Sequence, residues 1–431
     1  MPQELLHLNT RRIVIRVLLL GLLIAATVWS YFVVRWYIGN TLAEYFDSTG
    51  NNLQVAEMAA SLAPDDPLTH WRLAQVTLKN LPLDQQAQAI AQFEKAVSLS
   101  PNDYRFWMAL GTASEQAGDS VKAEQALKRA VELAPSYSYP RWYLGNLLLR
   151  SGRYDEAFAE LRRASEADAE LQPQQFNLIW EVYKTDSEAL TTAVGDNPAV
   201  RAKFSLYLLG RQEFEPGLRM WDTLNPAEKK SNRETGEAIV GNLLTVFRYH
   251  DAVGVWNDLA ADTNTRAEIG NVFDGGFELG PEMPFSWQVQ PVPNVQIGLD
   301  PSLSYSGGSS LRLIFNVRTN IENINIAQLV PVATNTAYDV EFYVRSEKLE
   351  TGGPPVVQSV DPTTSGVIVT SPLAATGDSD WKKVVLSFTT GDNTEAVLIK
   401  IERPSCGTKE APICPIFGSV WYDDFSFKRR N

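Results

Sequence analysis

An apolar stretch close to the amino terminus, residues 13–38, constrains this chain more than any other feature. It reads IVIRVLLLGLLIAATVWSYFVVRWYI. About 18 residues between Arg16 and Arg35 carry no charge, which at roughly 1.5 Å per residue is long enough for a helix to cross a hydrocarbon core. Trp36 and Tyr37 follow, and such amphipathic rings favour the headgroup layer. The stretch therefore predicts one transmembrane helix.

The charges on either side of this helix predict its orientation. The basic side chains on the amino side are Arg11, Arg12 and Arg16. The far side turns acidic at Glu44 and Asp47. By the positive-inside rule, residues 1–12 form a cytoplasmic tail and the rest of the chain is exported, as in a single-pass protein of a bacterial inner membrane with its bulk in the periplasm. A cleaved signal peptide is the alternative, but no small-x-small cleavage site follows the apolar run.

The overall composition is that of folded, acidic protein. Hydrophobic residues make up 44% and charged residues 21% of the chain, and 431 residues exceed the usual size of one domain. The formal net charge of −13 repels phosphate backbones, which argues against nucleic acid as a partner.

A pattern of small and large apolar residues repeats after the membrane helix. One unit consists of Trp107, Leu110, Gly111, Ser114, Ala123, Leu127, Ala130 and Pro135. The unit 34 residues later consists of Arg141, Leu144, Gly145, Leu148, Ala157, Leu161, Ala164 and Ala169, and the earlier unit contains Trp71, Ala74, Leu78, Ala89, Phe93, Ala96 and Pro101. The spacing resembles the tetratricopeptide repeat, in which small residues let two antiparallel helices approach closely. The resemblance implies an all-α superhelix over residues 39–170.

The repeat decays beyond residue 170 without disappearing. Gly217, Trp221 and Leu224 recur 35 residues later as Ala252, Trp256 and Leu259. We therefore interpret residues 171–262 as two or three degenerate helical hairpins that continue the array, with a separate helical domain as the alternative. The segment Asn225-Pro226-Ala227-Glu228 has the residues of a helix start.

The inner face of such an array is made mainly by the first helix of each repeat, and it usually binds a peptide or a helix. The repeat spacing places on this face Trp71, Arg105, Met108, Thr112, Tyr139, Trp142, Asn146 and Arg150. The resemblance therefore predicts a groove for a partner protein at these residues. The alternative for the two large rings, Tyr139 and Trp142, is that they pack on the neighbouring hairpin.

The pattern changes to period two beyond about Thr263. The clearest alternating segments are Val340, Phe342 and Val344; Val384, Leu386 and Phe388; and Val397, Ile399 and Ile401. Roughly eight such segments, separated by turn-rich connections, predict an all-β sandwich of two sheets over residues 264–431.

This β-domain also carries the landmarks of a known family. NVFDGGFELG, SYSGGSSLRLIF, NTAYDVEFYVRS, SDWKKVVLSFTT and GSVWYDDFSF follow in order, and the series resembles jelly-roll carbohydrate-binding modules of families 4, 9 and 22. The resemblance implies glycan binding and a structural calcium ion held by Glu278, Asp423 and Asp424. Carboxylates suit such a hard cation. The alternative is that Glu278 lies at an edge and the two aspartates end the last strand.

Glycan binding by such a module requires aromatic platforms. The candidates are Trp287, Tyr305, Tyr343, Trp381 and Trp421. Trp381 and Trp421 fall at landmark positions that the family normally buries, and an aromatic ring in a sandwich is more often in the core than at a ligand.

Cys406 and Cys414, the only cysteines, lie in one loop of the exported β-domain. An even count in an oxidising compartment predicts a disulfide between them. A metal site would need more ligands, and His7, His70 and His250 lie far away in sequence.

The sequence contains none of the motifs that would assemble a common catalytic site. It lacks GxSxG, HExxH, GxxxxGK and a GxGxxG that follows a strand. We therefore expect a non-catalytic envelope scaffold whose helical array binds a partner protein and whose sandwich contacts a glycan, in the synthesis, export or attachment of a surface polysaccharide (exopolysaccharide). The alternative is a subunit of a larger membrane complex that binds only proteins.

Overall fold

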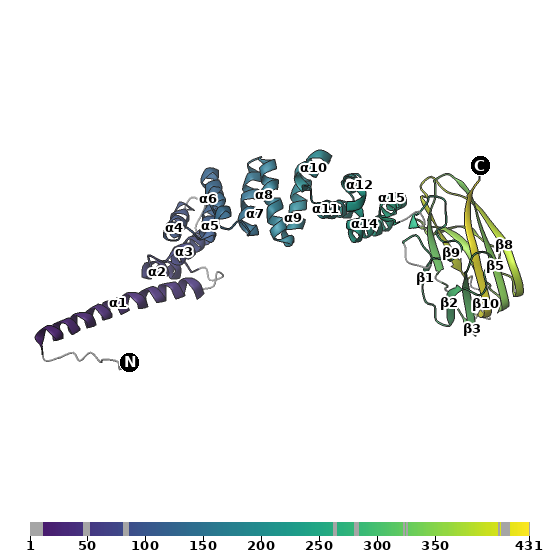
Figure 1. The fold of residues 1–431 in the computed structure, drawn as a ribbon, viewed down its shortest axis with the longest axis horizontal. Helices are drawn as coiled ribbons and strands as arrows, with labels where there is room; N and C mark the ends of the chain where they lie inside the picture. The colour runs from purple at the N-terminus through teal and green to yellow at the C-terminus, as the bar shows by residue number, and fades with distance from the viewer. Residues whose placement is uncertain are drawn as a thin grey trace, which may run out of the picture. The chain divides into compact units, whose positions relative to one another are not determined.

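The computed structural model places all the helices before all the strands (Figure 1). It describes residues 12–45, 52–80, 86–261, 265–279, 284–321, 324, 326–403, 406 and 414–430. The chain divides into two compact units, residues 1–195 and residues 196–431. The predicted fold class, a helical array followed by an all-β sandwich, is confirmed.

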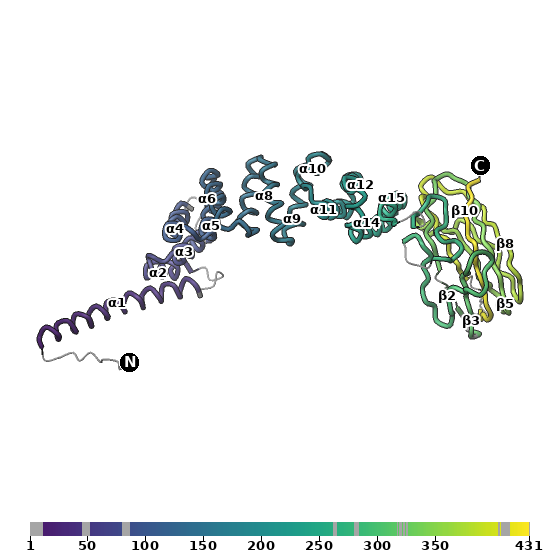
Figure 2. Tube along the Cα trace, viewed as in Figure 1, coloured from purple at the N-terminus to yellow at the C-terminus, as the bar shows by residue number. Residues whose placement is uncertain are grey.

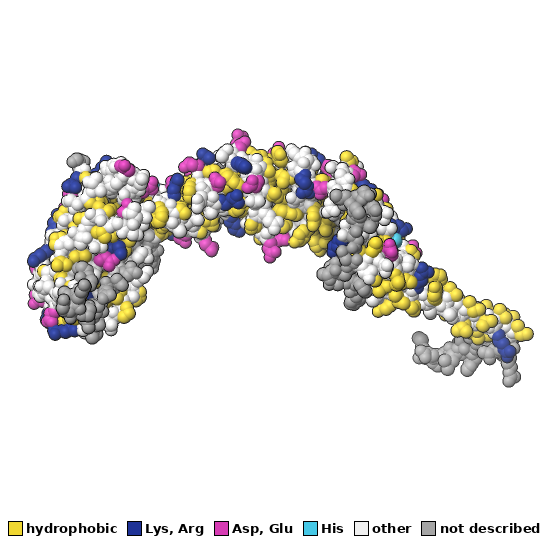
Figure 3. All heavy atoms as spheres, turned by 180° about the vertical axis from the view of Figure 1, so that it is seen from behind, with side chains coloured by type: hydrophobic (Ala, Val, Ile, Leu, Met, Phe, Trp, Pro, Cys, Tyr) yellow, Lys and Arg dark blue, Asp and Glu magenta, His cyan; other side chains and the backbone are white. Residues whose placement is uncertain are grey.

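Helix α1 (Ile13–Tyr45) confirms the long apolar helix expected near the amino terminus. Its apolar side chains point outward along most of its length and cover its surface in Figure 3. The helix is long and apolar enough to cross a membrane, a property that a signal sequence shares. Of the predicted cytoplasmic tail, residues 1–11 lie outside the described residues.

Paired helices follow α1 within the first unit. They are α2 (Leu53–Leu62), α3 (Pro67–Asn80), α4 (Gln86–Leu99), α5 (Tyr104–Gln116), α6 (Ser120–Leu133), α7 (Ser138–Arg150), α8 (Tyr154–Ala167), the short 3₁₀ helix η2 (Ala169–Leu171), α9 (Gln172–Tyr183) and α10 (Ser187–Val194). The small residues predicted from the repeat allow the two helices of each pair to pack closely. A Cβ on Gly111 would lie 2.6 Å from Cγ of Leu127, and one on Gly145 would lie 2.7 Å from Cγ of Leu161.

The second unit begins with further helices. They are α11 (Pro198–Gly210), α12 (Phe214–Asp222), α13 (Pro226–Ser231), α14 (Arg233–Thr245) and α15 (Tyr249–Leu259). Helices α9 and α10, α11 and α12, and α14 and α15 form hairpins, so the degenerate repeats exist as helical pairs with α13 inserted. Asn225 and Glu228 form the expected capping box at the start of α13.

Helices α11–α15 share their compact unit with the β-domain, whereas the sequence divides the chain near residue 263. Phe285 of the β-domain is buried in the same apolar core as Trp256 and Leu259 of α15. Asn257 donates to the carbonyl of Ala267 and accepts from its backbone N–H, both at 2.9 Å. The last helices and the sandwich are therefore packed together as one body.

Ten labelled strands build the sandwich, compared with the roughly eight expected from the sequence. They are β1 (Gln288–Val289), β2 (Val295–Asp300), β3 (Ser310–Asn320), β4 (Ile326–Pro331), β5 (Ala337–Thr351), β6 (Val356–Asp361), β7 (Gly366–Thr370), β8 (Gly377–Thr389), β9 (Ala396–Glu402) and β10 (Pro415–Arg429). One sheet has the order β1-β4-β9-β6-β7 and the other β2-β3-β10-β5-β8. Every strand pair is antiparallel, and Figure 2 shows the path of the second sheet.

The predicted period-two segments supply the core between the sheets. Val340 and Phe342 of β5 are buried against the opposite sheet, which contributes Ile399 and Ile401 of β9. Alternate residues of β5, among them Tyr343, therefore lie on the outer face of the second sheet.

Candidate functional site

The eight residues of the predicted groove come from helices α3, α5 and α7, and all of them stay at least partly accessible. The side chains of Arg105 and Arg150 are 62% and 58% exposed, and Tyr139 is 54% exposed. The half-buried members are Trp71, Met108, Thr112, Trp142 and Asn146. Trp71 and Met108 also pack against the core, and the exposed members Arg105, Tyr139 and Arg150 are the most accessible to a partner.

Polar contacts within and between the repeats order the groove residues. Arg150 of α7 reaches Glu115 of α5 at 2.6 Å, so the first helices of two repeats are joined directly. Asn146 donates to the carbonyl of Trp142 at 2.9 Å. The Arg105 guanidinium, 2.6 Å from Asp103, holds the pKa of that carboxyl below its usual value despite its partial burial.

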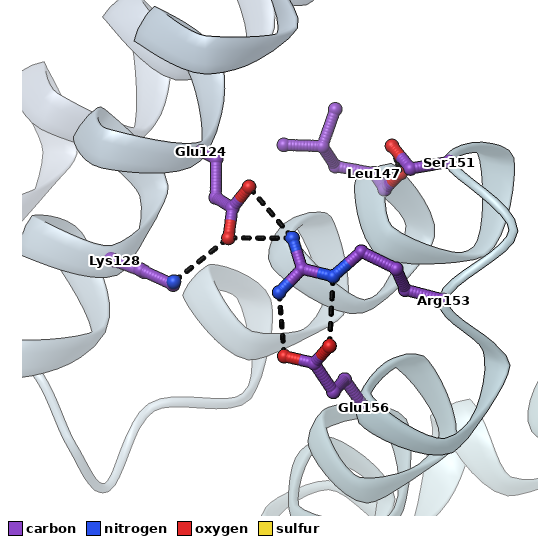
Figure 4. A network of polar contacts seen from close by, with 6 residues as sticks. All are labelled: Glu124, Lys128, Leu147, Ser151, Arg153 and Glu156. Atoms are coloured by element: carbon purple, nitrogen blue, oxygen red, sulfur yellow. Dashed lines mark hydrogen bonds and ion pairs between the residues drawn. The ribbon is translucent and has the colours of Figure 1, made fainter.

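A second set of ion pairs links the repeats through their other helices (Figure 4). Arg153, just before α8, lies 2.8 Å from Glu124 of α6 and 2.6 Å from Glu156, while Lys128 lies 2.7 Å from Glu124. Hydrogen bonds from Lys128 and Arg153 lower the pKa of Glu124. These residues are largely exposed, so the set aligns the repeats without adding much stability. Sequence analysis did not identify them, because Glu124 and Arg153 belong to different repeats.

Two of the five aromatic candidates in the sandwich are core residues. Trp287 is 4% exposed, and its ring centroid lies 4.8 Å from that of Phe425. Trp421 is 2% exposed and donates through Nε1 to Asp300 at 2.9 Å. Neither can act as an open platform for a sugar.

The other three candidates form an aromatic cluster on the outer face of the second sheet. The rings of Tyr305 and Tyr343 stack with their centroids 3.5 Å apart, and Trp381 meets Tyr305 edge-on at 6.2 Å. Tyr305 is 44% exposed and Trp381 is half-buried. Trp381 is therefore not a core residue, because it lies with Tyr305 on the outer face, whereas Leu386 and Phe388 of the same strand point into the core.

Charged side chains surround the aromatic cluster Tyr305–Tyr343–Trp381. Arg345, two residues beyond Tyr343 on β5, lies 2.7 Å from Asp380, the neighbour of Trp381. Lys383 is directly opposite Tyr343 in the β5–β8 register. A hydrogen bond with Tyr343 raises the pKa of Tyr305. The arrangement combines aromatic faces with donors and acceptors, which is what recognition of a hydroxylated ring requires.

The carboxylates predicted for calcium hold a loop instead. Oε1 of Glu278 accepts from the backbone N–H groups of Gly308 and Ser309, at 2.7 Å and 3.3 Å. Oδ2 of Asp423 accepts from those of Tyr305 and Ser306, at 2.6 Å and 3.1 Å. Both therefore fix the loop that carries Tyr305.

These contacts do not make a cation cage. Within the described ranges no group of three or more His, Cys, Asp or Glu side chains is close enough to hold a metal. Burial raises the pKa of the Asp423 carboxyl although three backbone N–H groups bind it. The calcium ion of Glu278, Asp423 and Asp424 stays a prediction that this geometry does not favour.

The cysteines are paired as predicted. Cys406 and Cys414 form a disulfide with their Cα atoms 5.4 Å apart. Beside it lies Arg403, a buried arginine that sequence analysis missed, which donates to the carbonyl and the sulfur of Cys414. Most of the loop between the cysteines lies outside the described residues.

Both described histidines have structural contacts. His70 Nδ1 shares a hydrogen bond with the side-chain oxygen of Gln92 at 2.7 Å, and its Nε2 contacts the carbonyl of Pro64 at 2.8 Å. His250 Nε2 contacts the carbonyl of Val332 at 2.8 Å. Their rings tie neighbouring segments together, as expected for residues with a packing role.

Comparison with protein families identifies the repeats. Two models of the tetratricopeptide repeat match residues 85–138 and 115–179. The predicted repeats are thereby confirmed over this part of the chain. Such repeats form extended surfaces that bind other proteins, so the array is a protein-interaction scaffold.

Curated relatives match about a quarter of the chain. "Superkiller protein 3" of Saccharomyces cerevisiae is 24% identical over 110 residues, which cover 26% of this chain and 8% of that protein. The "Peroxisomal targeting signal receptor" of Candida glabrata is 32% identical over 110 residues, which cover 26% of this chain and 18% of the receptor. The chain thus spans less than a fifth of the length of these relatives.

Solved structures resemble separate parts of the chain. MamA from Desulfovibrio magneticus RS-1 is 24% identical with a TM-score of 0.27, covering 32% of this chain and 75% of that one. The CBM22-1 xylan-binding domain from Paenibacillus barcinonensis Xyn10C is 17% identical with a TM-score of 0.26, covering 38% of this chain and 97% of that one. Scores this low assign neither a ligand nor a partner.

Proposed function

We propose that this chain is a non-catalytic, membrane-anchored scaffold of the cell envelope, whose helical array binds a partner protein and whose sandwich binds a glycan. The observation that carries the proposal is that large aromatic rings remain at the surface in both parts, Tyr139 in the array and Tyr305 in the sandwich. Neither ring is a member of the apolar cores of the array or of the sandwich. The glycan would be a surface polysaccharide during its synthesis, export or attachment.

The inner face of the array suits a peptide or a helix. Tyr139, Trp142 and Arg150 all belong to α7, and Arg150 donates to Glu115 of the preceding repeat at 2.7 Å. Aromatic and arginine side chains dominate the binding energy of protein interfaces. The groove therefore offers anchors whose positions are set before the partner arrives.

Replacing Tyr139 or Trp142 with Ala is expected to weaken partner capture without unfolding the array. Surface substitutions usually change the unfolding free energy by less than about 0.5 kcal/mol, whereas a truncated interface anchor costs about 2 kcal/mol of binding. Proteins that co-purify with the full chain from its own membrane would be quantified by mass spectrometry. Tyr154→Ala on α8, an exposed aromatic outside the groove, is the matched control. Equal recovery from all variants, or a large fall in melting temperature, would contradict the groove.

The aromatic cluster Tyr305–Tyr343–Trp381 is the glycan site that the geometry supports. Its rings are held on a sheet and by a loop that Glu278 and Asp423 fix, so the platform is rigid before a ligand binds. Arg345 and Lys383 provide donors at its edge, and Asp380 provides an acceptor.

Glycan binding by the full chain in detergent micelles is expected to fall at least about tenfold, or roughly 1.4 kcal/mol, when Tyr305 or Trp381 is replaced with Ala. Val385→Ala, an exposed apolar residue of the same strand as Trp381, is the control and should bind as the wild type does. A glycan array followed by calorimetry on the best ligand measures the effect. If no glycan binds the wild type, the alternative stands, namely a subunit that binds only proteins.

A further inference from the structure

The end of helix α1 is packed tightly against the first helical hairpin. A Cβ on Gly39 would lie 2.8 Å from Cβ of Ala63, so only glycine lets α1 approach this closely. Asn40 donates to the carboxylate of Asp66 at 2.7 Å, and Asp66 is buried. The end of the apolar helix is therefore in direct contact with the start of the array.

A groove of about 760 Å³ opens at this junction. It is lined by Ala43 and Glu44 at the end of α1, by Trp71 and Arg72 of α3, and by Arg105 and Phe106 of α5. Two of these residues, Trp71 and Arg105, belong to the predicted partner-binding face. The groove thus connects that face to the end of the membrane helix.

The position of the groove along α1 places it at the membrane surface. Ala43 follows the interfacial residues Trp36 and Tyr37 by six or seven positions on one unbroken helix, which is roughly 10 Å at about 1.5 Å per residue. That distance lies within the headgroup layer and just beyond it. An occupant must therefore reach its binding site close to the lipid.

The lining also indicates what kind of segment fits. The floor is aromatic, with the ring centroids of Trp71 and Phe106 6.0 Å apart. The rim carries both signs of charge, because Arg105 pairs with Asp103 and Glu44 lies opposite. Segments that leave a membrane are rich in Trp and Tyr and fit such a floor.

We propose that this membrane-proximal groove binds the interfacial segment of a second membrane protein, namely the residues that directly follow one of its transmembrane helices on the exported side. The inference rests on the proposed membrane anchoring and names the class of partner for the array. It gives a reason for the close packing by which Gly39 and Asn40 keep the groove next to the end of α1.

The test is site-specific photo-crosslinking in intact membranes with the full chain. A photo-reactive residue replaces Gln75, which lines the groove, or Tyr139, further along the same face. From Gln75 we expect crosslinks to another membrane protein within roughly ten residues of an apolar span, which is about 15 Å of helix. Trp71→Phe keeps a ring but reduces the aromatic floor of the groove, and it should lower the yield from Gln75 several-fold while leaving the yield from Tyr139 unchanged.

Other outcomes would overturn the inference. Crosslinks from Gln75 to a soluble protein, to a second copy of this chain or to lipid alone would each show a different occupant. Crosslinks from Tyr139 without any from Gln75 would leave the scaffold function standing and remove only the membrane-proximal site. No protein crosslink from either position would contradict both proposals.

Discussion

Replacing Arg403 with Met is expected to lower the unfolding free energy of the second unit by about 3–5 kcal/mol, because it removes a charged donor that several buried carbonyls bind. Arg403 is 5% exposed. Its Nε donates to the carbonyl of Gly353 at 3.0 Å and its Nη2 to the carbonyl of Cys414 at 2.5 Å. Its Nη1 donates to the carbonyl of Ile321.

These bonds join segments that are far apart in sequence. Ile321 directly follows β3, Gly353 lies between β5 and β6, and Cys414 directly precedes β10. Because Met fills a volume similar to that of Arg, the loss of unfolding free energy comes from carbonyls left without a donor and not from a cavity. Lys cannot substitute, since its ammonium lacks the planar fork that reaches three directions at once.

Urea unfolding of the full chain in detergent, followed by tryptophan fluorescence, measures the effect. Arg318→Met is the matched control, because Arg318 is 67% exposed and its ion pair is with Glu350, which is 58% exposed. Its loss should change the unfolding free energy by less than about 0.5 kcal/mol. An unchanged midpoint for Arg403→Met would show that the carbonyls find other donors.

The parts of the fold that follow from spacing were predictable. Gly111 and Gly145 repeat with the seam residues Leu127 and Leu161, and the structure shows that a side chain at either glycine would collide with the leucine. The alternation of Val340 and Phe342 likewise fixed which face of β5 is buried. In both cases local periodicity determines the contact.

The parts that depend on distant segments were not predictable. Trp381 looks like a core residue from its landmark position, and only its contact with Tyr305, from a distant loop, shows that it lies on the outer face. Glu278 and Asp423 were correctly brought to one region, but their binding to the backbone of the loop that carries Tyr305 depends on tertiary geometry. Arg403 carries no sequence signal, because its acceptors are carbonyls and any residue supplies one.

The change in composition and the apolar contacts divide the chain at different places. The composition changes near residue 263, yet α15 and the sandwich share a core across that point. Trp256 donates through Nε1 to the carbonyl of Thr265 at 2.9 Å, and Phe285 is 1% exposed beneath the helices. A change of secondary structure therefore does not mark the edge of a folding unit here.

A fragment of residues 264–431 is accordingly expected to be much less stable than one of residues 196–431. Cutting at 264 exposes Phe285, worth about 1.5–3 kcal/mol. It also removes Asn257, which binds the Ala267 backbone, and His250, which contacts the Val332 carbonyl. Each lost hydrogen bond costs about 1 kcal/mol of unfolding free energy. A total loss of at least about 3 kcal/mol corresponds to a melting temperature lower by roughly 6–12 °C in a unit of this size.

Calorimetry of the two fragments measures the difference. The longer fragment should unfold in one transition, because its helices and sheets share one core. A Phe285→Ala variant of the longer fragment separates packing from chain length: it should lose a large part of the same stability, since truncating a buried phenylalanine costs about 3–5 kcal/mol. If the two fragments melt together, or if the longer one melts in two steps, the helices and the sandwich are independent and the boundary near residue 263 is the physical one.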